Sequence, residues 1–86
     1  MYQPASTLTV DNANAALEVG LHAIEAGQSE IALSQVTGVD SSAVAVLLAW
    51  KRAAAARGAP LVFTGLSSSL LSLAELYGVT DLLRQH

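Results

Sequence analysis

The residues best placed to do chemistry stand together in the segment VTGVDSSAVAVLLAW, residues 36–50. An apolar stretch runs into Asp40, Ser41 and Ser42, and a helix-forming sequence follows at once. A carboxylate or hydroxyl at such a junction accepts hydrogen bonds from the free N–H groups of a first helical turn, so capping explains the residues. A regulatory contact explains them as well, because a phosphoryl group there would add about −1.5 to −2 charges. Both interpretations stay open on these residues alone.

The remaining reactive residues favour no catalysis. His22 and His86 are far apart, without the spacing of a metal site, and the chain has no cysteine. No serine stands in a G-x-S-x-G nucleophile elbow. No glycine-rich phosphate loop occurs, because Gly38, Gly58 and Gly65 stand alone. We therefore expect a protein that is not an enzyme and that holds no metal or cofactor.

Composition narrows the class of partner. The chain has 86 residues, a net charge of −3 and only four basic residues, so it cannot present the basic face that nucleic-acid binding requires. No apolar run approaches the roughly 18 residues of a membrane-spanning helix, and the start of the chain does not resemble a signal peptide. We expect a cytoplasmic protein without direct membrane insertion. The hydrophobic fraction of 52% predicts a folded core.

Strand and helix patterns alternate along the chain and predict one α/β domain over residues 1–86. Parallel strands covered by helices follow from this order. The strands are expected at 6–10, 29–37 and 60–65, and the last reads as a central strand covered on both faces. The helices are expected from a cap at Asp11 or Asn12 to Gly27, at about 42–57, and at 67–78, with a short helical end piece at 79–86.

The second predicted helix carries one apolar arc, made of Ala43, Val46, Leu47, Trp50, Ala53 and Ala54. Trp50 is the only tryptophan. It suits either an exposed interface anchor or a buried core position, and we favour the core because large aromatic side chains are mostly buried. Gly20 is expected to weaken the first helix slightly.

Three segments together resemble a STAS domain, the family of anti-sigma-factor antagonists and their relatives. They are GVDSSAVAVLLAW, LVFTGL and LAELYGV, and the resemblance covers residues 6–83. The family fold it implies is a small, mostly parallel sheet with helices packed on it. Within the family the sequence is most similar to the MlaB-like branch. This branch supplies the small STAS subunit of a bacterial ABC complex that maintains outer-membrane lipid asymmetry. Ser42 and Ala43 stand where many relatives have a glycine.

This resemblance implies a function and a site. It implies an accessory subunit that binds an ABC-type ATPase (MlaF-like), within a complex with a permease and an MCE-type protein. The protein would then be cytoplasmic and peripheral at the inner membrane. The partner-binding or regulatory residues would be Asp40, Ser41, Ser42 and Ala43. The alternative is an anti-sigma-factor antagonist that is regulated by phosphorylation at Ser41.

Overall fold

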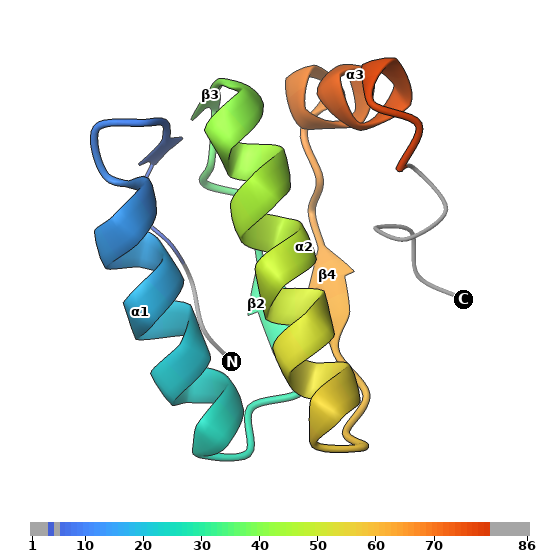
Figure 1. Cartoon of the computed structure of the whole chain (residues 1–86). Coiled ribbons are helices and arrows are strands. Elements are labelled where there is room, and N and C mark those ends of the chain that lie inside the picture. The colour runs from blue at the N-terminus through green and yellow to red at the C-terminus, as the bar shows by residue number, and fades with distance from the viewer. Residues whose placement is uncertain (1–3, 5, 80–86) are drawn as a thin grey trace.

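The computed structural model describes residues 4 and 6–79, and the expected helical end piece lies mostly outside them (Figure 1). Helices and strands alternate much as the sequence predicts. In chain order they are β1 (Thr7–Leu8), α1 (Ala13–Glu25), β2 (Glu30–Ala32), β3 (Gly38–Val39), α2 (Ser41–Ala56), β4 (Val62–Thr64) and α3 (Ser68–Leu76).

The strands form two parallel pairs. β1 pairs with β3, with Thr7 opposite Gly38, and β2 pairs with β4, with Ile31 opposite Phe63. Because each pair joins strands that are separated by a helix, the connections are crossovers. The predicted α/β class with a small parallel sheet is therefore confirmed.

The single strand expected at 29–37 is wrong. Only Glu30–Ala32 forms β2, and the Val36 N–H then donates to the Leu33 carbonyl at 3.0 Å to close a turn. Ser34 and Gln35 are exposed in this turn. The turn redirects the chain, so that β3 pairs with β1 and ends directly before Asp40.

A strand forms within the expected segment 60–65, as β4, but the expectation that it is a central strand covered on both faces is wrong. Among the described strands β4 pairs with β2, and of its three residues only Phe63 is buried. Val62 and Thr64 point to the opposite side from Phe63, because side chains alternate along a strand. There the Thr64 hydroxyl donates to Glu30 Oε2 at 2.9 Å, so this side of the β2–β4 pair carries polar contacts.

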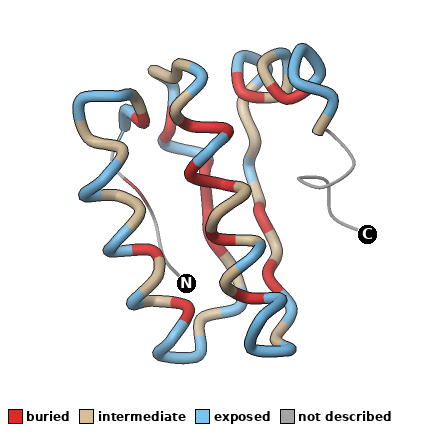
Figure 2. Tube along the Cα trace, in the orientation of Figure 1, coloured by how far each residue is buried: buried red, intermediate tan, exposed pale blue. Residues whose placement is uncertain are grey.

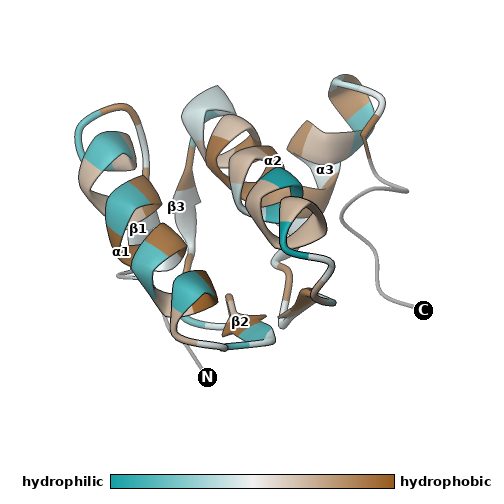
Figure 3. Cartoon of the chain, turned by 60° about the horizontal axis from the view of Figure 1, so that its bottom comes forward, coloured by the Kyte–Doolittle hydropathy of each residue, from teal (hydrophilic) through white to brown (hydrophobic). Residues whose placement is uncertain are grey.

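The core lies between α1, α2 and the strands, as Figure 2 shows by the buried positions on the inward sides of these elements. The outer side of α1 is hydrophilic in Figure 3, which fits a helix with one buried face. The fully buried large side chains come from nearly every element: Leu8, Ile31, Leu33, Val36, Leu47, Trp50 and Leu70.

Trp50 is fully buried between α1 and α2, so the core interpretation is confirmed. Its indole N–H donates to the Leu17 carbonyl of α1 at 3.1 Å, which satisfies its polar atom. Gly20 lies against the same ring, and a Cβ atom there would overlap the indole. The glycine that lowers the helix propensity of α1 therefore lets the two helices approach closely.

Candidate partner-binding site

Asp40 joins two turns at one end of the molecule. It is the N-cap of α2, and its Oδ1 accepts a hydrogen bond from the Ser42 backbone N–H at 2.8 Å. Its Oδ2 accepts another from the backbone N–H of Val10 at 3.0 Å, in the turn between β1 and α1. The predicted cap is confirmed, and the contact with Val10 adds a tie that the sequence does not reveal.

These hydrogen bonds stabilise the charged form of the carboxylate. The Val10 N–H lowers the pKa of Asp40 most, the Ser42 N–H lowers it further, and partial desolvation opposes them. The pKa of Asp40 is therefore held below its usual value of 3.8.

A lowered pKa predicts an acid-dependent contribution to stability. The contribution of a carboxylate with a lowered folded-state pKa is complete above its unfolded pKa and is lost as the pH falls through the folded value. Asp40→Asn keeps the shape and a capping oxygen but removes the charge. We expect the difference in Tm between wild type and Asp40→Asn to be largest near pH 6 and to shrink below pH 3.8. Thermal melts at both pH values measure it, and an equal difference at both would contradict the assignment.

The other three predicted site residues, Ser41, Ser42 and Ala43, differ in how far they are buried and in which side of α2 they occupy. Ser41 is exposed, Ser42 is half-buried and Ala43 is fully buried in the core. Ser41 and Ser42 lie on different sides of α2, because each lines a different hollow. The surface of the junction is thus made by Asp40, Ser41 and Ser42, while Ala43 anchors the first turn of α2.

The two hollows flank the start of α2. The larger is a groove of about 420 Å³ between α2 and the end of α3, lined by Ser41, Val44, Ala45, Leu48, Tyr77 and Val79. The second has about 270 Å³ and lies between α1 and α2, lined by Val10, Ala13, Asn14, Leu17, Ser42, Ala45 and Val46. Ala45 lines both hollows, so this exposed residue of α2 lies between them.

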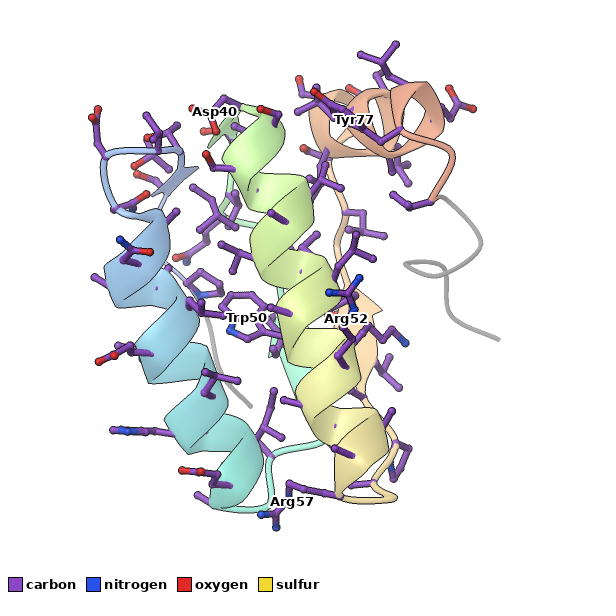
Figure 4. All side chains as sticks on the ribbon, in the orientation of Figure 1. Asp40, Trp50, Arg52, Arg57 and Tyr77 are labelled. Carbon is purple, nitrogen blue, oxygen red and sulfur yellow. The ribbon has the colours of Figure 1, made fainter. Side chains whose placement is uncertain are left out.

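Exposed apolar side chains gather at this end. The structure describes four large hydrophobic side chains that are exposed, and three of them, Val10, Leu76 and Tyr77, belong to the turns and helix ends around Asp40. The fourth, Val19, lies on α1. Figure 4 shows Tyr77 and Asp40 at the same end of the molecule, with Arg57 at the other. Clustered exposed apolar residues mark interaction surfaces, whereas isolated ones do not.

Outside the junction, Lys51 makes structural contacts. Lys51 Nζ donates to the Leu61 carbonyl at 2.8 Å and lies 5.5 Å from the centre of the Phe63 ring, so it ties α2 to β4. Desolvation lowers the pKa of Lys51. Within residues 4 and 6–79, no three His, Cys, Asp or Glu side chains are grouped so that they could hold a metal ion.

None of the helices in the described part of the chain has the length and apolar character to cross a membrane. His22 lies on α1 beside Glu18 and Glu25, around a shallow third hollow. The other predicted histidine, His86, falls outside the described residues.

Parallel strand pairs, crossover helices and an aspartate-capped α2 define a small parallel α/β domain of the STAS type. The family model described as "Mlab, STAS domain" matches residues 5–84, nearly the whole chain. The chain therefore belongs to the MlaB-type STAS domain family. Among curated proteins, none matches it significantly.

Proposed function

We propose that this chain is a non-catalytic accessory subunit of a bacterial phospholipid-transport ABC complex, which maintains outer-membrane lipid asymmetry. It binds the ATPase subunit through the Asp40–Ser42 junction and α2, on the cytoplasmic side of the inner membrane. The observation that carries this proposal is the match to the MlaB-type family over residues 5–84. The exposed apolar side chains around Asp40 support it, because they give the junction a surface that a partner can cover.

The junction is suited to binding because it is held rigid before any partner arrives. Asp40 fixes the first turn of α2 to the turn at Val10 through two hydrogen bonds. Ala43, in the same turn of α2, is buried and packs in the hydrophobic core. A preorganised surface loses less conformational entropy when it binds, so more of the contact energy appears as affinity.

A second function is favoured by one observation, the exposure of Ser41. A serine on the first turn of α2 is accessible to a kinase, and the helix N-terminus tolerates the added negative charge. This arrangement suits an anti-sigma-factor antagonist that phosphorylation at Ser41 releases from its partner.

Co-purification separates the two functions. We expect the tagged chain, isolated from its native host at low salt, to bring down an ABC-type ATPase together with a permease and an MCE-type protein. We expect intact-mass measurement to show mostly the unmodified chain. Recovery of only a kinase-type anti-sigma factor, with a large fraction carrying one phosphate on Ser41, would replace the transporter function by the regulatory one.

A further inference from the structure

The turn between β1 and α1, residues 9–12, is closed by hydrogen bonds to a single asparagine. The Asn12 backbone N–H donates to the Thr9 carbonyl at 3.1 Å, and Asn12 Oδ1 accepts from the Thr9 N–H at 2.9 Å. Asn12 Nδ2 donates in addition to the Thr7 carbonyl at 2.8 Å. The side chain of Asn12 therefore fixes both the turn and the strand that enters it.

Asp40 fixes the same turn to α2. The Val10 N–H donates to Asp40 Oδ2 at 3.0 Å, while Asp40 Oδ1 accepts from the Ser42 N–H at 2.8 Å. Val10 and Ser42 both line the hollow of about 270 Å³ between α1 and α2. Figure 1 shows the turn and the start of α2 at the same end of the molecule. The turn and the Asp40–Ser42 junction are thus continuous parts of one surface around this hollow.

The turn holds an apolar side chain out in solvent. Val10 is 72% exposed, although its backbone is fixed by Asp40. The hydrogen bonds of the turn therefore do not serve to bury this side chain. The hollow beside it has no charged side chain in its lining, which is mostly apolar: Val10, Ala13, Leu17, Ala45 and Val46, with Asn14 and Ser42. A fixed apolar group beside an apolar hollow loses little conformational entropy when a partner covers it.

We infer that the β1–α1 turn is a second part of the ATPase-binding surface, in which Val10 contacts an apolar side chain of the ATPase that enters the hollow between α1 and α2. The occupant is apolar because a charge there would be desolvated without a charged side chain to pair with it. Asn12 does not line the hollow, so it is a positioning residue that acts on binding through Val10. This inference rests on the proposed function, and Ser42 connects the two, because it belongs both to the proposed junction and to the hollow.

Two exposed valines give a matched pair of variants, with the purified ABC-type ATPase of the same organism as the probe. Val10→Ser removes the apolar contact. Val19→Ser is its control, because Val19 is also exposed, at 53%, and lies on α1 outside the hollow. Both are surface changes, so thermal melts close to wild type are expected. We expect Val10→Ser to weaken ATPase binding by about tenfold, the loss of one buried apolar contact, and Val19→Ser to leave it within about twofold.

Asn12→Ala tests the positioning role. It removes both side-chain hydrogen bonds that fix the turn and leaves Val10 unchanged. We expect a loss of about fivefold in ATPase affinity, measured at a temperature at which the variant is folded. Added to Val10→Ser, the same change should weaken binding further by less than about twofold, because two changes that act on one contact are not additive. A purely structural role would lower Tm and leave the affinity of the folded domain unchanged.

The outcomes separate this inference from the proposed function. If wild type binds the ATPase and Val10→Ser binds equally well, the turn lies outside the interface and the inference is overturned, while the proposed function stands. An equal loss for Val19→Ser and Val10→Ser would also overturn the assignment to the hollow. If Asn12→Ala leaves the affinity unchanged, or adds its full loss to that of Val10→Ser, the positioning role is wrong.

Two further outcomes change the partner itself. If wild type fails to bind the ATPase, both the proposed function and this inference fall. Self-association of wild type that Val10→Ser abolishes, seen by sedimentation, would make a second copy of this chain the occupant of the hollow and would overturn the inference.

Discussion

Replacing Trp50 with alanine is expected to lower the free energy of unfolding by about 3–5 kcal/mol, the usual cost of deleting a buried tryptophan side chain. Trp50 is fully buried, and its indole N–H is bonded to the Leu17 carbonyl, so the variant loses both packing and a satisfied polar contact between α1 and α2. A domain of 86 residues has about 4–13 kcal/mol of stability in total. Trp50→Ala should therefore lower Tm by more than about 15 °C.

Circular dichroism measures this effect, because the variant has no tryptophan fluorescence. Arg52→Ala is the matched control on the same helix, since Arg52 is exposed and should change stability by no more than about 0.5 kcal/mol. Similar Tm values for Trp50→Ala and Arg52→Ala would show that the Trp50 contact between α1 and α2 does not contribute substantially to the stability of the domain.

The second large effect is on binding. Ser41→Glu places a carboxylate on the first turn of α2, where the helix N-terminus favours negative charge, so the free domain should fold with a Tm near that of wild type. In the complex the same carboxylate would lie in the apolar groove that Ser41 lines. An unpaired charge in a desolvated contact costs about 2–5 kcal/mol, so ATPase binding should fall by about 30-fold or more.

Ser41→Ala tests how much the Ser41 hydroxyl itself contributes to binding, apart from the effect of added bulk and charge. It removes one exposed hydroxyl and adds no charge, and Asp40, not Ser41, caps the helix. We expect a change of less than about tenfold in ATPase affinity, measured in the same titration. If Ser41→Ala weakens binding as much as Ser41→Glu, the hydroxyl itself makes the essential contact.

The helices were predictable because their signals are local. Asp40 and Ser67 cap α2 and α3 as expected, and each helix ends before a glycine in the left-handed region, at Gly27, Gly58 and Gly78. The strands were less predictable because pairing joins distant residues. The turn at Ser34 and Gln35, which divides the expected 29–37 strand, contains neither glycine nor proline to reveal it.

The candidate site was predictable only in part. The capping role of Asp40 follows from its place between an apolar strand and a helix. Its second hydrogen bond does not, because it comes from the backbone N–H of Val10, 30 residues earlier. Likewise Tyr77 fits the apolar pattern of α3, and only the structure shows that its ring is exposed and lines the same groove as Ser41.

Equilibrium titration of the purified chain with the ABC-type ATPase of the same organism tests the central claim most directly. We predict saturable binding by wild type, and a loss of about 30-fold or more in affinity for folded Ser41→Glu. No binding by folded wild type would contradict the assignment as an ATPase-binding subunit. Equal binding by wild type and Ser41→Glu would place the interface away from the Asp40–Ser42 junction.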